Sequence, residues 1–90
     1  MNVVERELTL RNKYGLHARP ATLLAEVANR FESELLIEKE GQVSNGKSIF
    51  ELMMLAAEQG SCLKVRATGP DAEAALDALE ALINDKFNEE

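Results

Sequence analysis

The sequence of 90 residues has one cysteine, one histidine, two prolines and no tryptophan. A single cysteine, Cys62, cannot form an internal disulfide bond or supply the clustered thiolates of a structural metal site. With no second histidine, and no identifiable general base for Cys62, the sequence offers neither a metal centre nor a nucleophilic triad. We therefore expect no metal ion and no cofactor.

Long apolar runs are also missing. No run approaches the roughly 18 residues that a membrane-spanning helix needs. Residues 1–7 lack the basic stretch and the apolar core of a secretory signal peptide. We therefore expect a cytoplasmic protein without membrane insertion. Because two cores of half this length would each be too small, residues 1–90 should form one domain, with little room for a large substrate cavity.

Positive charge is scarce, since the formal net charge is −6, and this balance argues against a nucleic acid as partner. The acidic residues are unevenly distributed. None lies between Leu8 and Ala25, the segment that contains Arg11, Lys13 and Arg19. A basic segment in an acidic chain indicates an anionic ligand or an acidic partner surface, although three bases can also cluster by chance.

Hydrophobic periodicity predicts seven elements in the order β-α-β-β-α-β-α. They are a strand at 4–10, a helix at 18–31, a strand that begins at 35–37, a short strand near Val43, a helix at 49–58 ended by Gly60, a strand at 63–68 and a helix from 72 to about 87. Arg6 interrupts the apolar face of the first strand. The expected fold class is α+β, a two-layer sandwich with the long helices on one face of the sheet and the other face open to solvent.

His17 stands at the start of the first predicted helix, in the segment Gly15–Ala21. Pro20 fits only in the first turn of such a helix, where its missing N–H is not required. The unpaired N–H groups and the positive dipole end of a helix start form an anion site. A phosphoryl group on the imidazole would lie against the backbone amides of Ala18 and Arg19. The Arg19 guanidinium can add a charge-assisted hydrogen bond to it.

Imidazole suits this task, because it is largely neutral and nucleophilic near neutral pH. Interaction with a helix start stabilises an anion only modestly, which fits a group that must be passed on. A lone histidine in this place is, however, also commonly a helix cap or an exposed polar residue. Residue type and position alone leave both interpretations of His17 open.

Ser48 follows the turn signal Asn45–Gly46 and precedes Glu51 by three residues. This spacing matches a capping box, so Ser48 is predicted to be the N-cap of the second helix. A phosphate on its hydroxyl would be electrostatically compatible with a helix N-terminus. The capping role and a regulatory role are therefore compatible.

The second predicted helix carries more large apolar side chains than one face can bury: Ile49, Phe50, Met53 and Met54. We expect Phe50 or Met53 to stay exposed near His17. Exposed, adaptable apolar side chains suit a surface that docks several partners. Ordinary core packing is the alternative, and we expect it for Leu52 and Leu55.

Three motifs together carry a family resemblance. Gly15–Ala21 reads Gly-Leu-His-Ala-Arg-Pro-Ala, Asn45–Ile49 reads Asn-Gly-Lys-Ser-Ile, and Gly69–Ala72 reads Gly-Pro-Asp-Ala. In this pattern the chain resembles HPr, the histidine-containing phosphocarrier of the bacterial phosphotransferase system (PTS). The resemblance implies that enzyme I phosphorylates His17 on Nδ1, using phosphoenolpyruvate, and that His17 then donates to an enzyme IIA. It also implies four antiparallel strands and three helices, and a carrier whose partners supply the catalysis rather than an enzyme.

The resemblance further implies regulatory phosphorylation of Ser48 by an HPr kinase/phosphorylase. Gly46 and Phe50 depart from the larger aliphatic residues or methionine that the family often has there. The resemblance and the apolar pattern together give six candidate docking residues: Thr22, Leu23, Lys47, Ile49, Phe50 and Met53.

Several functional alternatives stay open. The acceptor could belong to sugar uptake or to a nitrogen-related regulatory branch. The chain could instead be a binding module controlled by Ser48, or a small ligand-binding regulatory domain of similar element order. A monomer is expected, because a carrier must present one site to several partners.

Overall fold

The structure, a computed structural model, describes residues 2–89. Its elements are β1 (Val3–Thr9), α1 (Ala18–Ala28), β2 (Glu34–Lys39), β3 (Gln42–Asn45), α2 (Ile49–Met54), β4 (Cys62–Thr68), α3 (Ala72–Asn84) and a final 3-10 turn, η1 (Lys86–Asn88). The strands and helices come in the predicted order.

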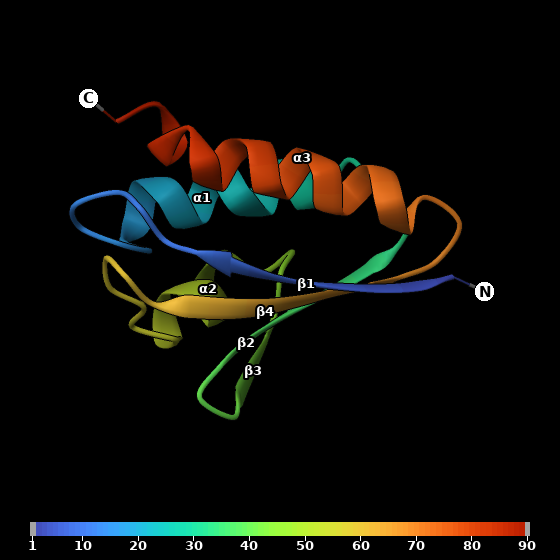
Figure 1. The fold of residues 1–90 in the computed structure, drawn as a ribbon, viewed down its shortest axis with the longest axis horizontal. Helices are drawn as coiled ribbons and strands as arrows, with labels where there is room; N and C mark the ends of the chain where they lie inside the picture. The colour runs from blue at the N-terminus through green and yellow to red at the C-terminus, as the bar shows by residue number, and fades with distance from the viewer. Residues whose placement is uncertain (1, 90) are drawn as a thin grey trace.

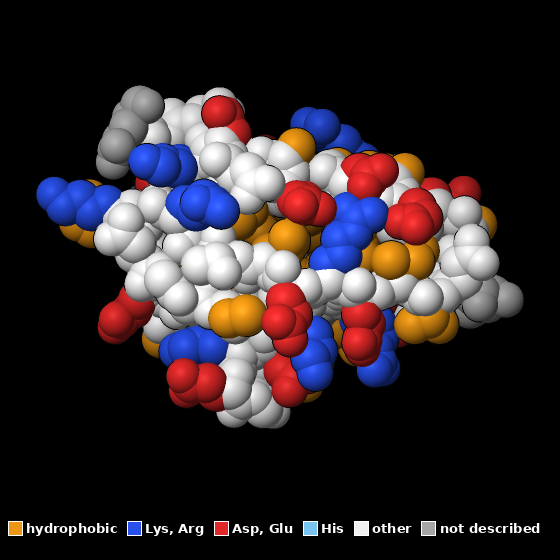
Figure 2. Space-filling model, in the orientation of Figure 1, with side chains coloured by type: hydrophobic (Ala, Val, Ile, Leu, Met, Phe, Trp, Pro, Cys, Tyr) orange, Lys and Arg blue, Asp and Glu red, His pale blue; other side chains and the backbone are white. Residues whose placement is uncertain are grey.

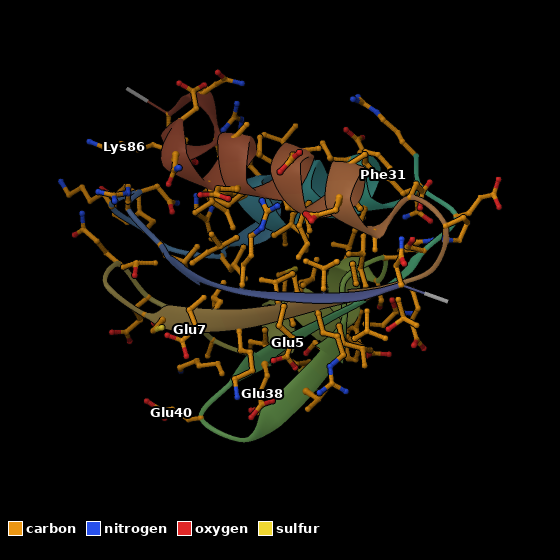
Figure 3. All side chains as sticks on the ribbon, turned by 45° about the vertical axis from the view of Figure 1, so that its right-hand side comes forward. Glu5, Glu7, Phe31, Glu38, Glu40 and Lys86 are labelled. Atoms are coloured by element: carbon orange, nitrogen blue, oxygen red, sulfur yellow. The ribbon has the colours of Figure 1, made fainter. Side chains whose placement is uncertain are left out.

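The four strands form one antiparallel sheet in the order β1-β4-β2-β3. Helices α1 and α3 lie side by side over one face of this sheet, and α2 packs against α1 and β3 (Figure 1). On the opposite face, the side chains of Glu5, Glu7 and Glu38 project away from the long helices (Figure 3). The predicted open-faced α+β sandwich is confirmed.

The core lies between the sheet and the two long helices. Alternate residues of β4 and the inner faces of α1 and α3 supply it, as their period-two and helical spacing predict. Its fully buried members include Leu24, Leu35, Ile37, Leu63, Val65, Leu76, Leu79 and Phe87. Within the part of the chain that the structure describes, no helix has the length and apolar character needed to cross a bilayer.

Arg6 interrupts the apolar face of β1 because it pairs with acidic side chains of α3. Its guanidinium lies 2.9 Å from Glu73 and 2.8 Å from both Asp77 and Glu80. The hydrogen bond to Asp77, supported by those to the other two carboxylates, raises the pKa of Arg6 against the effect of burial. The arginine thus joins the edge strand to the helix above it.

All three helices end earlier than predicted. Helix α3 ends at Asn84 rather than about residue 87, because the positive φ values of Lys86, Phe87 and Asn88 turn the chain out of the helix. Tertiary contacts explain the other two differences. Helix α1 ends at Ala28 rather than residue 31, because the side chain of Asn29 donates to the carbonyls of Ala25 and Lys47. Helix α2 ends at Met54 rather than residue 58.

The early end of α2 coincides with a change of direction of the chain. Leu55 and Ala57 are buried, and between them Ala56 has a φ of 51°. The chain therefore turns toward the core instead of continuing the helix. Gly60 does not end α2 as predicted, but lies in the turn before β4.

Asp71 ties the start of α3 to the segment before β2. It occupies the N-cap position, but its side chain makes no capping hydrogen bond. Its carboxylate instead accepts from the hydroxyl of Ser33 at 2.6 Å and from the backbone amides of Glu32 and Ser33, each at 2.9 Å. The hydrogen bond from the Ser33 hydroxyl, together with those from the two backbone amides, holds the pKa of Asp71 below its usual range.

The loop before α1 rests directly on the segment after α2. Leu16 donates its amide to the carbonyl of Ala57 at 2.9 Å. Gly15 has a φ of +64°, and a Cβ added there would overlap the Ala57 carbonyl and approach Cα of Glu58 to 2.8 Å. The motif therefore requires glycine at this position for both its backbone conformation and its close packing.

The first prediction concerns Arg6. Replacing it with methionine should lower the free energy of unfolding by about 1 kcal/mol, because three neighbouring carboxylates lose a shared counter-charge. Arg66→Met is the matched control, since Arg66 pairs with Glu5 on the open face of the sheet. Urea denaturation should give a smaller loss for the control. Equal losses, or a loss for Arg6→Met that 1 M salt leaves unchanged, would contradict this account.

The second prediction concerns Gly15. Gly15→Ala should destabilise the protein by roughly 2–3 kcal/mol, because backbone strain adds to the clash with Ala57. Gly41, with a φ of +86° and open space around it, isolates the strain alone. Thermal unfolding of Gly41→Ala should show the smaller effect, about 1 kcal/mol. Indistinguishable melting temperatures for the two variants would refute the close packing.

Candidate functional site

His17 occupies the N-cap position of α1 in an extended conformation, with φ −78° and ψ −172°. Its side chain makes no capping hydrogen bond and is 41% exposed. The alternative that the imidazole merely caps the helix is therefore wrong. The imidazole ring lies at the helix start and can make contacts with residues outside the helix.

The first turn of α1 leaves two backbone donors without a partner inside the helix. The first intrahelical hydrogen bond runs from the amide of Ala21 to the carbonyl of His17, at 2.9 Å. Pro20 has no N–H, so the unpaired donors are the amides of Ala18 and Arg19. The first turn contains no acidic residue. The helix start thus has the composition that an anion site requires.

A carboxylate from the C-terminal segment, Glu89, reaches this helix start. One of its oxygens lies 2.9 Å from Nε2 of His17 and 3.5 Å from Nη1 of Arg19. Its other oxygen accepts from Nδ2 of Asn12 at 3.1 Å. The acid-free neighbourhood of His17 that the sequence indicates is therefore an incomplete description, because Glu89 enters it in space.

The chain turn that brings Glu89 to His17 follows α3. Lys86, Phe87 and Asn88 have φ values of 55°, 56° and 59°, which turn the chain back. Phe87 is fully buried, and its carbonyl accepts from Nη1 of Arg19 at 2.8 Å. Figure 1 shows this C-terminal turn above the first turn of α1. A buried aromatic side chain and a backbone hydrogen bond thus fix the position from which Glu89 extends.

Several contacts keep Glu89 ionised. Burial acts to raise the pKa of this carboxyl, but the hydrogen bonds of Asn12 and His17 and the nearby charges outweigh it. The pKa of Glu89 is therefore lowered.

Tyr14 is an aromatic neighbour of the imidazole. Its ring packs edge to face against that of His17, at a centroid distance of 6.0 Å. The ammonium of Lys13 lies 5.4 Å from the centre of the Tyr14 ring.

Asn12 links the loop before α1 to the C-terminal segment. Its side chain is buried, and Nδ2 donates to the carbonyl of Gly15 at 2.7 Å as well as to Glu89. Because the Gly15 carbonyl and the Glu89 carboxylate are both acceptors, the nitrogen of the Asn12 side-chain amide must face them, and this fixes the orientation of that amide. Among the described residues, the Oδ1 atom of Asn12 has no hydrogen-bond partner.

The end of the molecule that carries this site is rich in basic side chains. Figure 2 shows several Lys and Arg side chains there, around the loop between β1 and α1. Arg11 and Lys13 of this loop are exposed, and the Arg19 side chain is half exposed. Among residues 2–89, no group of three or more His, Cys, Asp or Glu side chains is placed to hold a metal ion.

Ser48 lies away from His17, near the opposite end of α1. Asn29, which follows that helix, donates to the carbonyl of Lys47. The Ser48 hydroxyl accepts from the amide of Glu51 at 3.2 Å, as an N-cap should. The carboxylate of Glu51 accepts from the amide of Asn45 instead of that of Ser48, so only half of the predicted capping box forms.

The apolar side chains of α2 divide as the short helix requires. Leu52 and Leu55 are buried, as expected. Four others are exposed and form what we call the α2 apolar surface: Ile49 at 40%, Phe50 at 72%, Met53 at 44% and Met54 at 58%. Met54, absent from the predicted docking residues, belongs to this surface.

The remaining docking candidates already have contacts within the fold. Thr22 donates its hydroxyl to the carbonyl of Ala18, and Leu23 packs partly against the core. The ammonium of Lys47 donates to the carbonyl of Phe31 at 2.7 Å. These three side chains are therefore less available to a partner than the α2 apolar surface.

The motifs and the fold together have clear counterparts among known proteins. Residues 4–85 match the family model "PTS HPr component phosphorylation site". The chain is 41% identical to the phosphocarrier protein HPr of Xylella fastidiosa, covering 98% of this chain and 99% of that protein. It is 42% identical to the phosphocarrier protein NPr of Shewanella violacea, covering 99% and 98%. Further relatives are HPr-like Crh proteins.

A solved structure agrees with this relationship. The crystal structure of HPr-C-His from Thermoanaerobacter tengcongensis superposes with a TM-score of 0.93 at 44% identity, covering 97% of this chain and 98% of that one. Sequence and structure agree over nearly the whole length of both proteins. The chain therefore belongs to the HPr family of phosphocarrier proteins of the phosphotransferase system.

Proposed function

We propose that His17 accepts a phosphoryl group on Nδ1 from enzyme I, phosphorylated by phosphoenolpyruvate, and passes it to an enzyme IIA in sugar uptake. The observation that carries this proposal is the position of the ring at the start of α1, beside two unpaired backbone amides. Unpaired amides at a helix start can donate hydrogen bonds to an anion attached to the neighbouring imidazole. The relay would take place in the cytoplasm.

Phosphoryl transfer to His17 requires few catalytic groups from this protein. Phosphoryl transfer depends mainly on positioning and on stabilisation of charge. The amides of Ala18 and Arg19 supply dipolar stabilisation, and the guanidinium of Arg19 has further N–H donors besides the one given to Phe87. The partners bring the rest of the catalytic machinery, so the protein acts as a carrier and not as an enzyme.

The weakness of these interactions suits a relay. A helix N-terminus stabilises an anion by about 0.3–1 kcal/mol at an exposed position and by about 2 kcal/mol when partly buried. With its side chain 41% exposed, His17 belongs nearer the lower range. The phosphoryl group is thus held well enough to survive and loosely enough to leave.

Partner docking is assigned to the α2 apolar surface and the basic loop before α1. The first offers Phe50, Met53 and their neighbours as adaptable contacts. The second offers Arg11 and Lys13 to acidic partner surfaces. One chain contains the complete site, so we propose that the protein acts as a monomer.

The alternative branch of the relay is nitrogen-related regulation. The similarity to an HPr and to an NPr is nearly equal, at 41% and 42% identity. The His17 chemistry is the same in both branches. Parallel labelling with a sugar-type and a nitrogen-type enzyme I therefore assigns the branch by which donor transfers faster.

The third prediction is that His17→Ala abolishes phosphorylation. Incubation with enzyme I and labelled phosphoenolpyruvate should give the unaltered protein one acid-labile phosphate, and the variant none, because no other imidazole exists in the chain. Ser48→Ala is the matched control and should be labelled at the unaltered rate. Undiminished labelling of His17→Ala would overturn the proposed relay.

The second candidate function is regulation through phosphorylation of Ser48 by an HPr kinase/phosphorylase. It is favoured by the position of the hydroxyl, half-exposed and directly before the α2 apolar surface. A phosphate there would add about two negative charges beside the docking residues. It would act on partner binding and leave the distant His17 chemistry intact.

The fourth prediction tests this regulation with a charge mimic. Ser48→Asp should raise the KM for enzyme I about tenfold and leave kcat unchanged, because only docking is disturbed. Ser48→Ala should leave both constants unaltered, and should cost about 1 kcal/mol of stability through loss of the cap. Labelling of the protein by kinase and ATP should disappear in Ser48→Ala. No labelling of the unaltered protein would eliminate this second function.

A further inference from the structure

We propose that Glu89 is a positioning residue for the phosphoryl relay. It holds the proton of the neutral His17 ring on Nε2, leaves the lone pair of Nδ1 free to attack, and stabilises the ring as it becomes positively charged. This inference rests on the proposed function of His17.

The hydrogen bond itself determines the tautomer. The contact between Nε2 of His17 and Glu89 measures 2.9 Å, which is a hydrogen-bond distance. An ionised carboxylate can only accept, so Nε2 must donate and therefore carries the proton. In a neutral imidazole the other nitrogen then has the lone pair. Among the described residues, the side-chain hydrogen bond of the ring is the one at Nε2, and the ring makes no capping hydrogen bond to the helix.

Glu89 is itself held in place, which a positioning group requires. Its second oxygen accepts from the buried side chain of Asn12, and this asparagine is anchored on the carbonyl of Gly15. Arg19 approaches the oxygen that contacts His17. The Glu89 side chain is 19% exposed, against 41% for the imidazole. A chain of contacts from the loop before α1 thus orients the carboxylate that orients the ring.

The charged and titratable groups around the ring come from three segments. The loop before α1 contributes Tyr14, edge to face with the imidazole, and Lys13 behind it. Helix α1 contributes Arg19, and the C-terminal segment contributes Glu89. Among the described residues, the negative charge that contacts the ring is that of Glu89. Its contact is on Nε2, so Nδ1 can be phosphorylated without displacing it.

The transfer step balances with this arrangement. The Nδ1 lone pair forms a bond to phosphorus of the phosphorylated partner protein. The bond between phosphorus and the donor atom breaks, and its electron pair stays with the donor. The proton remains on Nε2, so the ring gains one positive charge that faces the Glu89 carboxylate. When the phosphoryl group is transferred to the acceptor protein, the bond between phosphorus and Nδ1 breaks. Its electron pair stays on Nδ1, and the ring is neutral again.

The fifth prediction concerns the unphosphorylated protein and is measured by long-range 1H–15N NMR of His17 above the pH at which the ring is protonated. The expected signature is one tautomer, with a proton-bearing Nε2 and a bare Nδ1. In Glu89→Ala the two nitrogen shifts should approach each other. Water then replaces the carboxylate, and because water can hydrogen-bond either nitrogen, it does not select one tautomer. Glu7→Gln, which removes one negative charge on the open face of the sheet, should give the unaltered spectrum. A proton on Nδ1, or identical shifts with and without the carboxylate, would overturn the inference.

The kinetic arm measures phosphoryl acceptance from enzyme I. Glu89→Ala should lower kcat about tenfold with an unchanged KM, because a charge-assisted hydrogen bond is lost and docking is not. Glu89→Gln, which keeps an acceptor oxygen but no charge, should recover part of the loss. Melting temperatures confirm that each variant is folded. Equal kcat values for Glu89→Ala and Glu7→Gln, or a change in KM alone, would contradict the positioning role.

The two proposals fail in different ways. If the unaltered protein gains no phosphate, the relay itself is wrong. If the unaltered protein is labelled and Glu89→Ala is labelled equally fast, the relay stands and the role of Glu89 is wrong.

Discussion

Two backbone amides without a helical partner, those of Ala18 and Arg19, are the constraint on which the rest of the site depends. Pro20 removes a third donor, and the carbonyl of His17 takes up the amide of Ala21. What remains are two unpaired donors, and we propose that they stabilise an anion on the neighbouring imidazole. The loop before α1 and the C-terminal turn serve to hold His17 at that surface.

The fold around this helix start could be predicted in its order and layers, because alternation and helical spacing report which face of an element is buried. The ends of the helices could not. Asn29 ends α1 through its bond to Lys47, and α2 stops where Leu55 and Ala57 turn into the core. Arg6 likewise interrupts the apolar alternation of β1, and only the structure shows that acidic side chains of α3 pair with it. These features depend on contacts distant in sequence.

The same distinction holds for the site. His17, Ala18 and Arg19 are predictable because a local motif places them together at a helix start. Glu89 is not, because 72 residues separate it from His17 and the turn at 86–88 uses non-glycine residues with positive φ. The donor and acceptor proteins come from family resemblance and not from the geometry. The family relationship supports a phosphocarrier, and the relatives of this chain include proteins named HPr, NPr and Crh.

We propose that Nδ1 of His17 carries the phosphoryl group, and this assignment can be measured. The most direct measurement is 31P and 15N NMR of the protein after incubation with enzyme I and phosphoenolpyruvate. We expect one phosphorus resonance with coupling to Nδ1 of His17, and a retained proton on Nε2. Coupling to Nε2, or phosphate bound at any other residue, would contradict it.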